Sequence, residues 1–212
     1  MVRRRRTLPA SVRMPRAWRR NGLTALILTL ISACIFYDRS AAPEVAGSDY
    51  EKYHDKSFRV VHVVDGDTLH IDIPDGNHDA TRIRLWGVDT PETGHGNTEE
   101  MYFGPEAKTF AKETLEGRSV HVVLAEKRTR DKYERLLAYV YLERGGVMFN
   151  ELLLEEGYAY ADRRFAHHYR DQFEAAEALA RRGRKGLWAG VKSEQMPPWR
   201  QRMDKDSGQR SP

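Results

Sequence analysis

Two acidic side chains lie at positions that could bring them together to hold a metal ion. Asp67 stands at the start of one predicted strand, and Asp89 stands just past the end of the next. The hairpin between the two strands returns the chain to the same end of the sheet, so both carboxylates can meet there. Two carboxylates and a nearby backbone carbonyl are hard oxygen ligands of the kind that Ca²⁺ prefers, completed by water and a phosphate oxygen.

Three further side chains could act on a phosphate group held at that ion. Glu92 follows Asp89 on a loop restrained by Pro91, where it could accept a proton from an attacking water. Arg84 and Arg135 stand on two predicted strands, and two guanidinium groups can clamp a phosphate and neutralise the charge that develops on it. The combination predicts metal-dependent hydrolysis of a phosphodiester.

Each of these segments also has a plainer reading when it is taken alone. Asp65-Gly66-Asp67 is a common hairpin turn, the segment 89–92 resembles a helix start, and single arginines are usually surface charges. The joint pattern is more specific than any of its parts. The sequence contains no Cys/His cluster with zinc spacing, no G-x-S-x-G elbow and no Walker loop.

The elements that position these residues are predicted by hydrophobic periodicity. Period-two alternation predicts five strands at 58–64, 68–73, 81–86, 120–124 and 136–142. Helical spacing predicts about three helices, at 104–117, near 150–156 and near 168–182, the last with Tyr169, Phe173, Ala176 and Leu179 facing inward. This order predicts an α+β fold, a five-stranded β-barrel of the OB type, whose open face commonly binds oligonucleotides.

Charge is distributed unevenly along the 212 residues. The net charge is +4, but residues 1–22 hold eight arginines and no acidic residue, so the remainder is mildly acidic. Attraction for phosphate must therefore come from a local basic patch. The length indicates one domain with appendages: a basic and apolar segment at 1–37, a polar linker at 38–55, the folded domain at 56–191 and a polar, disordered tail at 192–212.

The N-terminal segment indicates export from the cytoplasm. An apolar run at 23–37 follows the arginines, and Ile31-Ser32-Ala33-Cys34 resembles a lipoprotein box with its single cysteine. Three interpretations remain open: a lipoprotein signal lipidated at Cys34, an uncleaved membrane anchor, and a cleaved signal or organellar targeting segment. The run is short against the roughly 20 residues that a membrane span needs. We expect a cell-envelope or extracellular location, tethered to the membrane through residues 23–37.

Three segments of the sequence, at 65–68, 84–92 and 128–139, resemble the thermonuclease (staphylococcal nuclease) family, and the match runs from about residue 58 to residue 188. The resemblance implies an OB-fold nuclease that uses one Ca²⁺ to cleave DNA and RNA, leaving 3′-phosphates. It also implies roles for matching residues: metal ligands Asp67, Asp89 and the backbone oxygen of Thr90; catalytic Arg84, Glu92 and Arg135; and, at the terminal phosphate of the nucleotide, Lys132 and Tyr133.

Some positions depart from the family pattern or stay open. Glu134 and Leu136 flank Arg135, where the best-known member has glycines, and the extra carboxylate could weaken phosphate affinity. The aromatic residue that stacks on a base could be Tyr158, Tyr160 or Phe165. The basic groups Arg163-Arg164 and Arg181-Arg182-Gly183-Arg184-Lys185 are interpreted as solvated faces that could also guide nucleic acid, and His167-His168 as a solvated helix start. The rival function is a catalytically inactive OB-type module that binds nucleic acid or protein at the membrane.

Overall fold

The computed structural model describes residues 45–94, 99–206 and 208. The predicted signal or anchor segment, Cys34 and the first part of the predicted linker lie outside the described residues. Among the residues that are described, no helix is long and apolar enough to cross a membrane.

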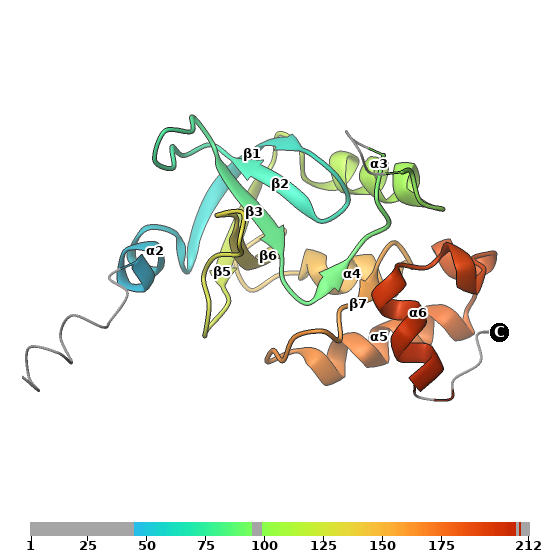
Figure 1. Cartoon of the computed structure of the whole chain (residues 1–212). Helices are drawn as coiled ribbons and strands as arrows, with labels where there is room; N and C mark the ends of the chain where they lie inside the picture. The colour runs from blue at the N-terminus through green and yellow to red at the C-terminus, as the bar shows by residue number, and fades with distance from the viewer. Residues whose placement is uncertain (1–44, 95–98, 207, 209–212) are drawn as a thin grey trace, which may run out of the picture. The chain divides into compact units, whose positions relative to one another are not determined.

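Five strands close into a barrel in the order β1-β2-β3-β6-β5, with β1 and β5 completing the ring (Figure 1). All neighbouring strands pair antiparallel except β3 and β6, which are parallel. The strands match the five predicted ones to within two residues at each end: β1 Lys56–Val63, β2 Thr68–Ile71, β3 Thr81–Leu85, β5 Ser119–Leu124 and β6 Leu136–Tyr141. The prediction of an OB-type barrel is therefore confirmed.

The alternating apolar residues of the strands fill the barrel. Each of them is 1% exposed or less: Val60, Val63, Leu69, Ile71, Ile83, Leu85, Val120, Val122 and Leu124. Strand β6 is instead buried along almost its whole length, because helix α4 (Phe149–Glu155) covers its outer face. Asn150 of α4 joins the two layers, since its side chain accepts from the Val140 N–H and donates to the carbonyls of Trp86 and Ala138.

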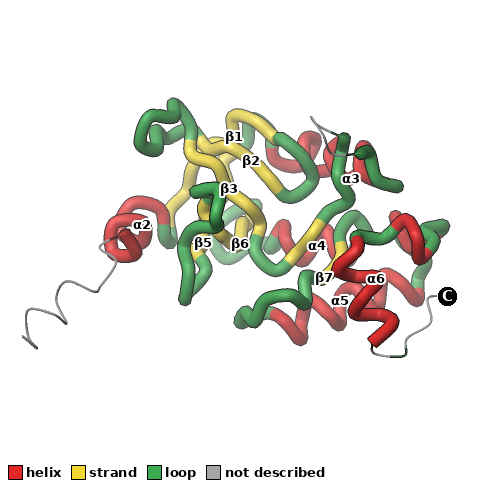
Figure 2. Tube along the Cα trace, viewed as in Figure 1, coloured by secondary structure: helices red, strands yellow, loops and turns green. Residues whose placement is uncertain are grey.

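Helix α2 lies at one end of the barrel, and the helices from α3 to α6 lie toward the other (Figure 2). Helix α3 (Gly104–Leu115) packs on β1, and α5 (Arg170–Arg182) packs on α4. Beyond the predicted strands, β4 (Val88–Asp89) pairs with β7 (Tyr160–Ala161) in a two-stranded sheet. This small sheet brings the segment that follows β3 next to the segment that leads into α5.

The predicted inward face of α5 is partly wrong. Phe173 and Ala176 are buried as expected, but Leu179 is 61% exposed, whereas Glu177 and Ala180 are buried. The reason is that the C-terminal helix α6 (Pro198–Asp206) packs on α5 and supplies Arg200 to Glu177. The Glu177–Arg200 ion pair is therefore buried on the side of α5 where helical spacing alone would place Leu179.

The boundaries predicted for the linker and the tail also differ from the structure. Helix α2 (Val45–Tyr53) occupies part of the predicted linker, with Tyr53 fully buried and Asp49 ion-paired to Arg130. The predicted tail contains the short 3₁₀ helix Ser193–Gln195 and α6, in which Trp199 and Arg200 are buried. Both segments are polar in composition because ion pairs provide much of their attachment, and composition cannot distinguish a buried charge from a solvated one.

Candidate active site

A cleft of about 530 Å³ opens beside the ends of β2 and β3. It gathers most of the side chains that the sequence singled out, from four separate stretches of chain. Its lining includes Asp67, Arg84, Asp89, Glu92, Lys132, Tyr133 and Arg135. The predicted convergence of the three segments is therefore present in the structure.

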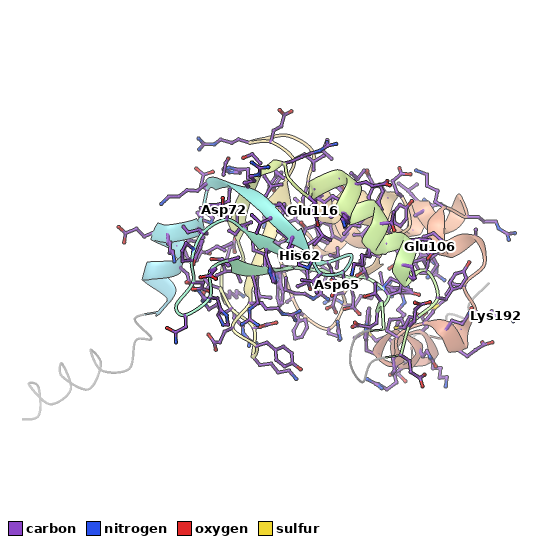
Figure 3. All side chains as sticks on the ribbon, turned by 90° about the horizontal axis from the view of Figure 1, so that it is seen from above. His62, Asp65, Asp72, Glu106, Glu116 and Lys192 are labelled. Atoms are coloured by element: carbon purple, nitrogen blue, oxygen red, sulfur yellow. The ribbon has the colours of Figure 1, made fainter. Side chains whose placement is uncertain are left out.

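Asp67 is held by the turn between β1 and β2. The Asp65 carboxylate accepts the Asp67 N–H at 3.1 Å, and Figure 3 labels Asp65 in this turn. Across the cleft floor, the Thr90 N–H donates to Asp67 Oδ2 at 2.7 Å. Gly66 makes this approach possible, because a Cβ at that position would lie 2.7 Å from Thr90 Cγ2. The turn is thus fastened to the segment that carries Asp89.

The far side of β1 is also anchored. The Glu116 carboxylate, which follows α3, accepts the Val63 N–H at 3.1 Å. His62 lies beside Glu116 in Figure 3, with His62 Nδ1 3.9 Å from Glu116 Oε2. The last residues of β1 before the Asp65 turn therefore have a fixed position against α3.

Arg84 lies between the two aspartates and contacts both. Its two terminal nitrogens lie 2.6 Å from Asp67 Oδ2 and 2.6 Å from Asp89 Oδ1. One of them also donates to the Val88 carbonyl at 3.0 Å, which holds the guanidinium across the bend after β3. Both carboxylates are largely buried, and burial raises the pKa of Asp67 to about 7 although Arg84 acts in the opposite direction. Burial likewise raises the pKa of Asp89.

This arrangement fits a hard divalent cation. The carboxylate oxygens of Asp67 and Asp89 are hard donors. Together with Asp162, these two groups outnumber the two arginines that pair with them, Arg84 and Arg164. Within the described residues, no group of three or more His, Cys, Asp and Glu side chains is placed so that it could by itself hold a metal ion. A cation would therefore depend on water and substrate oxygens for the rest of its coordination.

Glu92 stands at the rim of the same cleft with its side chain exposed. Its carbonyl accepts the Met101 N–H at 2.9 Å. Gly104 begins α3 directly against that carbonyl, where a Cβ would lie only 2.2 Å away. Although the side chain reaches solvent, the cleft that it lines desolvates the carboxylate in part, and this desolvation, followed by the negative charges of Asp67 and Asp89, raises the pKa of Glu92 above its ordinary value. A carboxylate with a raised pKa is a suitable proton acceptor.

Arg135 enters the cleft from the start of β6. Its Nε donates to Asp131 Oδ2 at 2.8 Å, and a terminal nitrogen donates to the Thr68 hydroxyl at 3.2 Å. Asp131 also accepts the N–H groups of Tyr133 and Arg135, which fixes the loop. The Lys132 amine lies 4.8 Å from the centre of the exposed Tyr133 ring, at the outer edge of the cleft.

Two residues at the site escaped sequence reasoning. Arg164, predicted to be a solvated charge, lies 3.1 Å from Asp89 Oδ1 and pairs with Asp162 at 2.8 Å. Trp199, from the predicted disordered tail, donates its indole N–H to Asp89 Oδ2 at 2.7 Å. The spacing Asp162-x-Arg164 could have indicated that Arg164 is ion-paired and not solvated. Nothing near Trp199 in the sequence connects it with Asp89.

The structure also separates the three aromatic candidates for base stacking. Tyr160 is fully buried, and the Tyr158 ring packs on Phe110 with centroids 4.2 Å apart. Phe165 is partly exposed, lines the cleft and stacks on Trp86 with centroids 5.2 Å apart. Of these three, Phe165 is therefore the one that a base in the cleft could reach.

Comparison with known proteins supplies the family. Residues 82–190 match the family model described as staphylococcal nuclease homologue. The chain is 34% identical to a thermonuclease of Staphylococcus hyicus over 169 residues, covering 79% of this chain and 96% of the relative. It is 40% identical to a thermonuclease of Staphylococcus intermedius, covering 63% and 76%. It is also 34% identical to endonuclease YncB of Bacillus subtilis, covering 68% of each chain. The chain therefore belongs to the staphylococcal nuclease family.

Proposed function

We propose that this protein is a calcium-dependent endonuclease that hydrolyses phosphodiester bonds of DNA and RNA and leaves 3′-phosphates. The observation that carries the proposal is the pair of buried carboxylates, Asp67 and Asp89, joined by Arg84 in a cleft that Glu92 and Arg135 also line. The relatives named thermonuclease and endonuclease support the same reaction class.

Each side chain has a task in this reaction. Asp67, Asp89 and the Thr90 carbonyl would hold the cation, which when bound supplies Lewis-acid polarisation of the phosphate. Glu92 takes a proton from the attacking water, whose oxygen bonds to phosphorus while the P–O5′ bond breaks. The 5′ oxygen leaves as a hydroxyl after taking a proton from solvent. Arg84 and Arg135 donate to the phosphate oxygens as negative charge builds on them, and removing one such contact typically costs about 3–4 kcal/mol of barrier.

The outer edge of the cleft would hold the rest of the substrate. Lys132 and Tyr133 present an amine and a hydroxyl at this edge, suited to the neighbouring phosphate. Phe165, stacked on Trp86, offers an exposed ring face to a base. Because stacking tolerates any base, this edge favours substrates without strong sequence preference.

We also propose that the protein is exported and tethered to the membrane. The support is the sequence of residues 1–37 alone: arginines, an apolar run and the lipoprotein-like Cys34. Labelling cells with radioactive palmitate while expressing the wild type and Cys34→Ser distinguishes the cases. Loss of label and of membrane association in the variant supports lipidation, whereas unlabelled wild type in the membrane fraction supports an anchor.

The nuclease proposal is tested with the full-length protein, single-stranded DNA and RNA, with calcium or with a chelator. Glu92→Gln should lower kcat at least about 100-fold, because the proton acceptor is lost. Glu113→Gln, an exposed glutamate on α3, is the matched control and should cut like the wild type. Binding of oligonucleotide without cleavage in calcium would instead favour the inactive binding module.

A further inference from the structure

The C-terminal helix α6 contributes directly to the site, although it lies beyond the residues that match the family model. Trp199 is its second residue, and its indole N–H donates to Asp89 Oδ2 at 2.7 Å. The other oxygen of Asp89 receives Arg84 at 2.6 Å and Arg164 at 3.1 Å. Donors from β3, from the segment after β7 and from α6 thus meet at one carboxylate.

The orientation of Trp199 is itself strongly determined. Trp199 is 7% exposed, and the Arg164 guanidinium lies 4.6 Å from the centroid of its ring. The next residue, Arg200, is fully buried and donates to both oxygens of Glu177 on α5, at 2.6 and 2.8 Å. Arg200 also pairs with Asp204 at 3.0 Å. Helix α6 therefore cannot rotate without breaking a buried ion pair.

We propose that Trp199 is a positioning residue for Asp89, a role that rests on the proposed nuclease function. An indole N–H is a neutral donor, so it fixes the direction of the carboxylate without cancelling its charge. Arg84 and Arg164 orient Asp89 too, but each adds a positive charge that opposes a bound cation. Trp199 is thus suited to hold Asp89 Oδ2 in place while leaving the carboxylate able to attract calcium.

The chain offers a closely matched control for this role. Trp188 is 6% exposed and belongs to the same buried cluster as Trp199. Arg181 lies over its ring at 4.9 Å, as Arg164 does over Trp199. Its indole nitrogen has no hydrogen-bond partner among the residues that the structure describes. Trp188→Phe and Trp199→Phe therefore remove similar ring area, but only the second removes a hydrogen bond to Asp89.

The experiment measures calcium binding to full-length wild type, Trp199→Phe and Trp188→Phe by isothermal titration calorimetry, together with kcat and KM on single-stranded DNA. Trp199→Phe should weaken calcium binding about tenfold, the usual cost of losing a partner that orients a metal ligand. Excess calcium should restore most of its kcat, with KM for DNA unchanged. Trp188→Phe should bind calcium like the wild type.

Three outcomes would each overturn the role of Trp199: Trp199→Phe binds calcium as tightly as the wild type, both variants bind it equally weakly, or the wild type does not bind calcium. Calcium binding without cleavage by the wild type would refute the nuclease function alone, and calorimetry would still decide the positioning. If Trp199→Phe does not fold, the test uses the unsubstituted protein labelled with 5-fluorotryptophan, whose fluorine signals are followed by NMR as calcium is added. Calcium must then shift the fluorine signal of Trp199, and an unmoved signal contradicts the proposal.

Discussion

Replacing Arg200 with methionine would remove a fully buried cation of α6 that pairs with Glu177 of α5. Its guanidinium donates to both oxygens of Glu177, which is itself only 1% exposed. Methionine has a similar length and fills much of the same space. The substitution therefore tests the ion pair more than the packing.

The magnitude follows from what Glu177 keeps after the change. Glu177 Oε2 still accepts the Ala161 N–H at 2.7 Å, so the carboxylate cannot turn to solvent without losing a bond to β7. Arg163 and Arg181 remain at 3.8 and 3.9 Å from Glu177 Oε1 and compensate only in part. Removing one partner of a buried pair costs about 3–5 kcal/mol of unfolding free energy, and we expect about 3 kcal/mol here because of those two arginines.

Urea unfolding followed by circular dichroism measures this loss, and hydrogen exchange reports whether α6 opens by itself. A loss of about 3 kcal/mol corresponds to a fall in Tm of roughly 6–12 °C for a domain of this size. The double variant Arg200→Met/Glu177→Gln should recover about 1.5 kcal/mol, since the glutamine keeps the bond to Ala161 without a buried charge. A single variant within about 1 kcal/mol of wild type, with unchanged exchange in α6, would refute the reasoning.

Other substitutions test the fold outside the cleft. Burial alone would raise the pKa of Asp75, but the hydrogen bonds and charge of Arg130 lower it below 3.8. The stabilisation from ionised Asp75 is therefore present above about pH 4 and is lost as the pH falls. In urea unfolding, the free energy of unfolding of Asp75→Asn should be lower than that of the wild type at pH 7, and the difference should be much smaller at pH 2. Asn150→Ala should cost about 2–3 kcal/mol, because the Val140 N–H loses its acceptor, and an unchanged urea midpoint would contradict this. Glu134 has a φ of +61°, a left-handed conformation that glycine adopts without strain, so Glu134→Gly should raise the unfolding free energy by about 0.5–1 kcal/mol. An unfolding free energy below that of the wild type would show that the strain at Glu134 is negligible.

The sequence was sufficient for the parts of the molecule whose signals are local. The five barrel strands could be predicted because apolar residues mark them over a few positions: most of them alternate between a core face and an outer face, and β6 is apolar along its length. Asp67, Arg84 and Asp89 lie on or beside two consecutive strands, so a single hairpin brings them together. The chemistry of their side chains also indicated Glu92 and Arg135, and the resemblance to a known family added Lys132 and Tyr133; all four line the same cleft.

Only the tertiary structure decided which polar residues are buried. Trp199 and Asp89 are 110 positions apart, and no local pattern connects them. Helices α2 and α6 have the composition of solvated segments because the ion pairs of Asp49 and Arg200 add to the few apolar side chains that attach them. A charged residue looks the same in the sequence whether water or a partner satisfies it. The contribution of the C-terminal helix to Asp89 therefore emerges only when the partners are seen in space.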